Sequence, residues 1–126
     1  MSSENSALKD KFAQHLGIEV LSCSEGHAKV KLVVQPHFLN GAGLVHGGIL
    51  FSLADYAFAL ASNAGEDSGL AVNSSINFIK ACAAGDELFA EAGLVSRSRK
   101  LGTYQIDVTN RSGEEVARVQ SLAYFK

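Results

Sequence analysis

An acidic residue stands inside a mostly apolar stretch of this sequence. Residues 49–64 read ILFSLADYAFALASNA, and Asp55 lies in the middle of them. Burying an isolated carboxylate costs several kcal/mol, so it must be paired, be hydrated at a site, or hold its proton unusually tightly. This stretch contains no Lys or Arg that could pair with it. Asp55 is therefore a candidate catalytic carboxylate. The alternative is a structural Asp that is hydrogen-bonded to distant backbone, to Ser52 or to Ser74.

Two glycines, Gly47 and Gly48, stand where the apolar stretch begins. The first backbone N–H groups of a helix have no acceptor within the helix and carry the positive end of its dipole. Glycine leaves them uncovered, so that a carbonyl oxygen that becomes an oxyanion could be stabilised there. The alternative is that both glycines simply permit a tight turn from loop to helix.

Asp55 lies seven residues beyond Gly48, which is about 10.5 Å along a helix axis. Within one chain the two residues cannot contact the same small carbonyl group. Two such helices packed antiparallel across a two-fold axis would place each Asp55 opposite the glycines of its partner. The spacing therefore favours a C2 dimer with two identical composite sites.

Composition limits the class of protein. A chain of 126 residues fits one domain, covering residues 1–126. Its net charge of −2 provides no global field for nucleic acid or an anionic membrane. The polar N-terminus lacks the pattern of a signal peptide, and residues 49–64 are shorter than the ~20 needed to span a bilayer. We therefore expect a soluble, cytoplasmic protein without nucleic-acid or membrane partners.

The cysteines give no sign of a metal site. Cys23 and Cys82 are far apart, with neither a CxxC motif nor a His at ligand spacing. This pattern predicts two reduced, buried thiols rather than a disulfide or a zinc site.

Hydrophobic periodicity predicts the elements that must position these residues. A short helix is expected over Ala7–Leu16, and hairpin turns over residues 84–86 and 107–113. Strands are expected over residues 18–23, 28–34, 70–79, 87–100, 102–109 and 115–125. One long helix among five or six such strands indicates an α+β fold with an antiparallel sheet. Because that helix is apolar on nearly every side, we expect it to be buried all round, with the sheet curled around it.

A long apolar helix that begins with His46-Gly47-Gly48 and is wrapped by an antiparallel sheet resembles the hotdog fold. The segment LNGAGLVHGGILFSLAD closely resembles the phenylacetic-acid-degradation (PaaI-like) subgroup of hotdog acyl-CoA thioesterases. The likeness runs from about residue 40 through SSINFIKACAAGDELFAEA and the strand that begins at Gly102. The ordered set of Asn40, His46, Gly47, Gly48 and Asp55 carries it.

The resemblance implies a thioester hydrolase that releases a free acid and CoA. Asp55 would act as nucleophile or as general base for a water, and the helix N-terminal amides would form the oxyanion hole. Asn40 would orient the thioester carbonyl, and His46 would support the loop and its donors. Taken alone, Asn40 is also a plain turn residue and His46 a satisfied, half-buried histidine. A homodimer, doubled to a tetramer, is expected, with no cofactor, because coenzyme A is part of the substrate.

Other residues are candidates for substrate binding. Arg97, Arg99 and Lys100 form the densest basic cluster and could hold the phosphates of coenzyme A, with Lys80 a weaker candidate. The alternative for the cluster is a solvated strand end. A hydroxyl that positions the attacking water in some relatives would fall near Ala71, Asn73 or Ser74.

Three aromatic residues, Phe51, Tyr56 and Phe58, suggest an aryl or arylacetyl acyl group, with a medium-chain group as the next choice. Two other functions remain open from the sequence. One is a non-catalytic acyl-CoA-binding module, which should not need Asp55. The other is an enoyl-CoA hydratase that uses Asp55 and His46.

Overall fold

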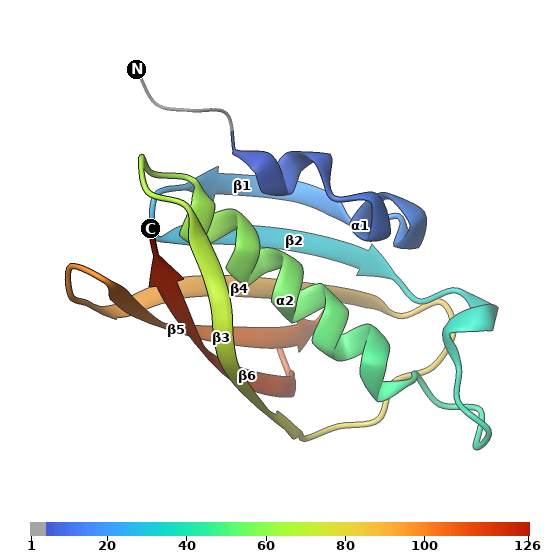
Figure 1. The fold of residues 1–126 in the computed structure, drawn as a ribbon. Coiled ribbons are helices and arrows are strands. Elements are labelled where there is room, and N and C mark those ends of the chain that lie inside the picture. Colours follow the sequence, from blue (N-terminus) through green and yellow to red (C-terminus); the bar gives the residue numbers. More distant parts are fainter. Residues whose placement is uncertain (1–4) are drawn as a thin grey trace.

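A computed structural model describes residues 5–126 of the chain (Figure 1). The helical elements are η1 (Ser6–Lys9), α1 (Lys11–Leu16), η2 (Pro36–Phe38) and α2 (Gly47–Asn63). The strands are β1 (Glu19–Ser24), β2 (His27–Val33), β3 (Gly69–Phe78), β4 (Glu87–Arg97), β5 (Leu101–Asn110) and β6 (Glu115–Phe125). Every predicted strand is present, with bounds that differ by a few residues.

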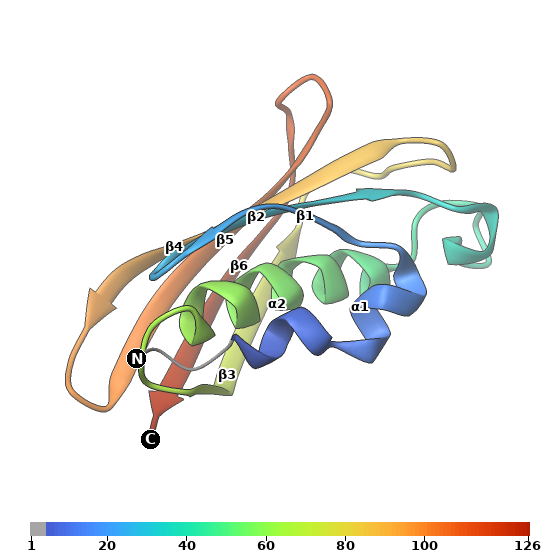
Figure 2. The ribbon, with the colours of Figure 1, turned by 90° about the horizontal axis from the view of Figure 1, so that it is seen from above.

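The six strands form one antiparallel sheet in the order β1-β2-β4-β5-β6-β3. Figure 2 shows the sheet curving over α2, with α1 beside α2 on the face away from the sheet. The predicted α+β architecture, an antiparallel sheet wrapped around one long helix, is confirmed. No helix in residues 5–126 is long and apolar enough to cross a membrane.

The core lies between α2 and the concave face of the sheet. Alternate residues of each central strand point inward, as the period of two requires. The fully buried side chains include those of Leu32, Leu88, Ile106 and Val119 from the sheet and Leu53 and Leu60 from α2. The core therefore fixes both the position of α2 and the side that it turns outward.

The prediction that α2 is buried on every side is wrong for the single chain. Gly48 is exposed, and Ser52, Asp55 and Ala59 are half-buried along the same face. Their spacing of three and four residues makes them neighbours on the helix surface. We call these four residues the open strip of α2. Within residues 5–126, α1 lies beside Ser52 and Asp55 but leaves the strip partly exposed, so the carboxylate of Asp55 remains accessible from a pocket.

The N-terminal helix also differs from its prediction. Asp10 has extended backbone angles (φ −63°, ψ 114°) and divides the expected helix Ala7–Leu16 into η1 and α1. Ala13 and Leu16 are buried, whereas Phe12 is 57% exposed. The regular spacing of Leu8, Phe12 and Leu16 is therefore not one buried stripe, because the helix restarts between the first two.

The turn at residues 84–86 is present but is not a hairpin. β3 pairs with β6 and β4 pairs with β2 and β5, so this connection crosses between non-adjacent strands. As a result β3 lies at the edge of the sheet, and its Leu70, Val72 and Phe78 are exposed. The turn within residues 107–113 does join a hairpin, β5 to β6.

The two cysteines have different environments. Cys82 is buried as predicted, whereas Cys23 is exposed, since it lies on the edge strand β1. Both are free thiols.

Candidate active site

His46 caps the N-terminus of α2. Its Nδ1 accepts a hydrogen bond from the Gly48 N–H at 2.8 Å, and its carbonyl oxygen accepts from the Ile49 N–H at 2.9 Å. Among residues 5–126 no acceptor is found for the Gly47 N–H. The first free amide at this helix end is therefore that of Gly47, and the Gly48 amide is occupied by the histidine ring.

Both glycines are also required by packing. A Cβ atom on Gly47 would lie 3.0 Å from the Phe78 ring, and one on Gly48 would lie 3.0 Å from His46 Nδ1. Such contacts are tighter than ordinary Cβ contacts and would force a neighbour to move. Neither glycine has a positive φ, so the turn into the helix does not itself require glycine, and the Gly47 amide has no acceptor among residues 5–126.

A pocket of about 320 Å³ opens beside Gly47. Asn40 and Lys80 supply its polar groups, and Phe78 and Leu50 supply apolar wall. Asn40 Oδ1 accepts the N–H groups of Ala42 (2.9 Å) and Leu44 (3.1 Å) and so closes the loop. Asn40 is therefore a turn residue, as the alternative interpretation held. Its side-chain Nδ2 has no acceptor among residues 5–126. Lys80 Nζ lies 3.3 Å from Glu114 Oε2.

The Asp55 carboxyl group has no hydrogen-bond or ion-pair partner in the part of the chain that the structure describes. Ser52 Oγ donates to the Gly48 carbonyl oxygen at 2.6 Å, and Ser74 Oγ lies 2.8 Å from Ser121 Oγ. The two hydroxyls considered as partners are thus bonded elsewhere. Burial, together with the nearby Asp10 charge, raises the pKa of Asp55 above its ordinary value. Asp55 is therefore half-buried, has no partner among the described residues, and binds a proton more readily than an ordinary Asp.

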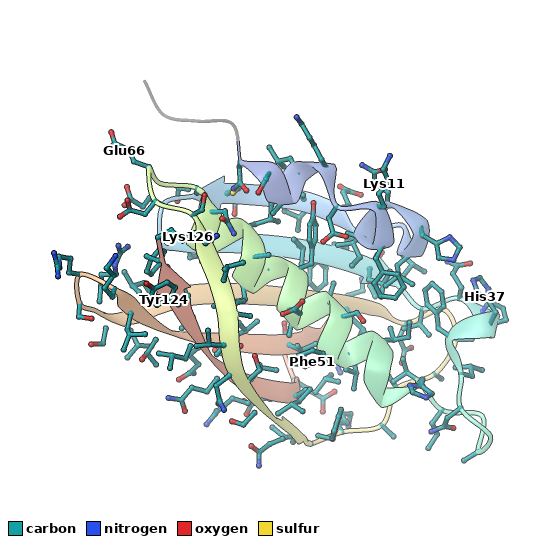
Figure 3. The ribbon with its side chains drawn as sticks, viewed as in Figure 1. Lys11, His37, Phe51, Glu66, Tyr124 and Lys126 are labelled. Atoms are coloured by element: carbon teal, nitrogen blue, oxygen red, sulfur yellow. The ribbon has the colours of Figure 1, made fainter. Side chains whose placement is uncertain are left out.

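Asp55 lines a pocket of about 180 Å³ between α2 and α1. Its walls also include Asp10, Phe12, Ile18, Phe51 and Tyr56. A second pocket, of about 330 Å³, continues past Phe12 and Ser52 to Phe38 and His46. We call the two together the α1 groove. Figure 3 shows Phe51 on α2 and His37, another wall residue of the second pocket, at η2.

The predicted aromatic wall is partly wrong. Phe51 and Tyr56 do line the α1 groove, but Phe58 is 2% exposed and packs edge-on against Tyr104 in the core. Phe12 and Phe38 take its place. Neither was predicted as a wall residue: the regular spacing of Phe12 with Leu8 and Leu16 indicated core, and no pattern singled out Phe38.

The basic cluster lies at the other end of α2. Arg97 Nη2 contacts Asp67 Oδ2 at 3.0 Å, and its guanidinium stacks on the Phe125 ring at 3.5 Å. Lys100 Nζ lies 5.7 Å from the ring centre of Tyr124, and Arg99 has no partner among the described residues. Figure 3 shows Tyr124 at the end of the molecule opposite to His37. The cluster is therefore remote from Gly47 within one chain.

No single pocket in residues 5–126 contains both Asp55 and Gly47. They are eight positions apart on one helix, which is about 12 Å along its axis. They also line different sides of α2. Within one chain, Asp55 and the Gly47 amide therefore do not meet in one pocket. Ser74, on β3, lines neither pocket that contains them.

Comparison with known proteins gives one consistent result. The profile of the thioesterase superfamily matches residues 42–117. The acyl-coenzyme A thioesterase PaaI of Escherichia coli is 40% identical over 108 residues, which are 86% of this chain and 77% of that protein.

Solved structures agree. The PaaI protein from the E. coli phenylacetic acid degradation operon superposes with a TM-score of 0.91 at 36% identity, covering 94% of this chain and 86% of that one. The Streptococcus mutans protein smu.793, solved bound to acetyl CoA, superposes at 0.83 with 29% identity, covering 86% of this chain and 88% of that one. The chain belongs to the thioesterase superfamily and is a PaaI-like, hotdog-fold thioester hydrolase that acts on acyl-CoA.

Proposed function

We propose that two copies of the chain share each active site, in which Asp55 of one copy and the Gly47 amide of the other act on one acyl-CoA thioester. The observation that carries this proposal is the unpaired Asp55 carboxylate on the open strip of α2. An unpaired, half-buried carboxylate costs stability, so its presence points to a chemical use. Its complement, a free helix-end amide, lies on the same helix but out of reach.

The exposed edge of β3 supports the dimer. A long edge strand presents a row of unpaired backbone groups, and Leu70, Val72 and Phe78 are exposed on this one. Antiparallel pairing of two β3 edges would join the sheets and lay the two α2 helices antiparallel on the same side. The open strips would then face each other, with each Asp55 toward the partner's Gly47. We further propose that such dimers pair into a tetramer.

Two chemical routes fit this arrangement. As general base, Asp55 would take a proton from water while the water oxygen bonds to the thioester carbon. The resulting oxyanion would be held by the Gly47 N–H until the C–S bond breaks and the CoA thiolate takes the proton. As nucleophile, Asp55 would displace the thiolate to form an anhydride, which water then hydrolyses. Each route consumes one water and yields an acid and a thiol, and neither requires a further cofactor.

The other site residues would act around this carbonyl. Since His46 occupies the Gly48 amide, we assign the oxyanion donor to Gly47 and a supporting role to His46 and Gly48. The free Nδ2 of Asn40, in the same pocket as Gly47, could donate to the same oxygen. Mutagenesis reports that removing one such donor lowers kcat by about 10²- to 10³-fold.

Coenzyme A would be held mainly by cations. In the antiparallel dimer the β4–β5 turn of one copy approaches the N-terminal end of α2 in the other. Arg99 and Lys100 would then reach the phosphates of a substrate bound beside Gly47, together with Lys80 of that pocket. Arg97 is the weakest of these candidates, because Asp67 and Phe125 already hold its guanidinium.

The acyl group would occupy the α1 groove, next to Asp55. The walls of the groove contain Phe12, Phe38, Phe51 and Tyr56, which favour an aryl or arylacetyl group over a medium-chain one. A place in phenylacetate degradation would follow from an arylacetyl substrate. Membership of a hydrolase family does not support the two other functions considered from the sequence, a non-catalytic binding module and an enoyl-CoA hydratase.

Thiol release from a panel of phenylacetyl-, benzoyl-, hydroxybenzoyl- and straight-chain acyl-CoAs tests the reaction and the acyl group. Mixing two inactive variants tests the shared site. Asp55→Asn and Gly47→Val chains, unfolded and refolded together at equal amounts, form heterodimers in which one site contains both changes and the other contains neither. Recovery of about a quarter of wild-type activity is expected from random pairing. No recovery, with heterodimers present, would place Asp55 and Gly47 in one chain's own site.

A further inference from the structure

We propose that Asp10, at the start of α1, is a positioning residue of the active site: it lines the same pocket as Asp55, and its negative charge makes the Asp55 carboxylate a better proton acceptor. This inference rests on the proposed role of Asp55. It concerns a residue outside both the motif that carries the family resemblance and the part of the chain that the superfamily profile matches.

The backbone fixes where Asp10 stands. Its N–H donates to the Ala7 carbonyl oxygen at 3.1 Å, and its Oδ1 accepts the Ala13 N–H at 2.9 Å. The segment that carries it is attached to α2, because Asn5 Nδ2 donates to the Leu60 carbonyl oxygen at 2.9 Å. Asp10 is therefore held between η1 and α1, on the wall of the pocket that contains Asp55.

Among residues 5–126, the ionisable residues that line this pocket are Asp10, Asp55 and Tyr56. The other described wall residues are apolar apart from Ser52. On the elements packed around it, the basic residues Lys9, Lys11 and His15 of η1 and α1 do not line the pocket, nor does His46 of α2. Glu19 and Cys23 of β1 are likewise outside it. A like charge in a poorly hydrated space disfavours ionisation of its neighbour.

The pKa values of both ionisable neighbours of Asp10 are raised. Burial is the main cause that raises the pKa of Asp55, and the Asp10 charge is the second. The same two causes raise the pKa of the Tyr56 hydroxyl, with a smaller contribution from Cys23. A carboxylate with a raised pKa takes a proton from water more readily, which is what a general base needs.

Capping alone does not explain an Asp at this position. Asn, Ser and Thr cap a helix about as well as Asp and add no charge. The cap needs the oxygen that accepts the Ala13 N–H, whereas the charge makes ionisation of Asp55 harder. The negative charge interacts favourably with the dipole of α1, and from the wall of the shared pocket it also acts on Asp55.

Asp10→Asn separates the two roles, because it keeps a capping oxygen and removes the charge. The acid limb of the kcat/KM profile should move to lower pH, and plateau kcat should fall by less than about tenfold. The ¹³C NMR titration of the Asp55 carboxyl, identified by its loss in Asp55→Asn, should move in the same direction. Asp10→Ser should behave as Asp10→Asn does.

Asp86→Asn is the matched control. Asp86 Oδ2 also accepts a backbone N–H three residues away, from Ala83 at 2.9 Å, but it lines a different pocket. This variant should change neither the acid limb of the kcat/KM profile nor the ¹³C NMR titration of Asp55. If Asp10→Asn also leaves them in place while Asp55→Asn abolishes turnover, the proposal for Asp10 is wrong and that for Asp55 stands. If Asp55→Asn keeps its turnover, the function proposed for Asp55 fails, and the NMR titration still decides whether Asp10 acts on it.

Discussion

Two sides of α2 have opposite character. On the side toward β3, Gly47, Asn40 and Lys80 present hydrogen-bond donors and a cation. On the side toward α1, Asp55 and Asp10 present carboxylates among aromatic walls. One side suits an oxygen that gains negative charge, and the other suits a base beside an apolar acyl group.

Under the proposed function, this difference makes one chain an incomplete enzyme. Two sides of the same helix cannot converge on one carbonyl, whereas the proposed two-fold axis would place the donor side of one copy against the acidic side of the other. An interface of this kind is complementary to itself because its halves differ. Each side of α2 can be tested in turn.

The largest effect is expected from the acidic side. Asp55→Asn removes the base or nucleophile, and hydrolysis should fall by about 10²- to 10⁴-fold. Steady-state thiol release measures it, with Asp86→Asn as a control that keeps full activity. Turnover within a factor of a few of wild type would contradict the role assigned to Asp55.

The same substitution should stabilise the fold near neutral pH by about 0.5–2 kcal/mol, as replacement of destabilised active-site groups often does. Because folding raises the pKa of Asp55, the folded chain binds the proton more tightly than the unfolded chain. The free energy of unfolding of the wild type therefore falls as pH rises from about 3.9, the ordinary pKa of Asp, through the raised pKa of Asp55 in the folded chain. Urea titrations should show the gain at pH 7 and no gain below about pH 3.9. A gain independent of pH would point to packing instead.

The donor side should give the next largest effect. Gly47→Ala places a Cβ atom 3.0 Å from the Phe78 ring and shifts the free amide, so kcat should fall by about 10²-fold. KM should change little, because the oxyanion forms after binding. Gly93→Ala, where a Cβ would meet nothing within 4 Å, should stay fully active. If Gly47→Ala and Gly93→Ala lowered kcat equally, the role of Gly47 as oxyanion donor would be contradicted.

Phe12 tests the apolar wall of the acidic side. Phe12→Ala should raise KM for aryl-CoAs by about tenfold, from lost contact with the ring, and should change straight-chain substrates less. Since Phe12 is 57% exposed, the free energy of unfolding should change by no more than about 0.5 kcal/mol. Phe89→Ala, on a ring flanked by Lys29 and Lys31 outside the α1 groove, provides the comparison. An unchanged preference among acyl groups would move the acyl site out of the α1 groove.

The smallest effect concerns the cap between the two sides. His46→Ala removes the acceptor for the Gly48 N–H and should lower the free energy of unfolding by about 1 kcal/mol. His46→Asn, which keeps a capping acceptor, should restore most of that stability in urea titrations. If His46→Ala instead abolishes turnover without a loss of stability, the ring takes part in the chemistry.

Much of the fold could be predicted from the sequence. The strand periodicity and the length of the apolar stretch at residues 49–64 indicated one helix wrapped by an antiparallel sheet. What failed were features that depend on distant partners. Residues 84–86 form a turn, but local residues cannot tell whether the strands it joins lie side by side. The break at Asp10 was missed because the spacing of Leu8, Phe12 and Leu16 fits an unbroken helix.

For the site, the sequence by itself determined which groups are unusual. A carboxylate in an apolar helix and a glycine pair at its start are visible in the chain, and their spacing rules out contact with one carbonyl inside a single copy. The tertiary structure decided what surrounds each group. It placed the His46 ring on the Gly48 amide, left that of Gly47 free, and brought Asp10 and Phe12 to the pocket of Asp55. Such assignments depend on which surfaces pack together, and packing is set by the whole core rather than by any local run of residues.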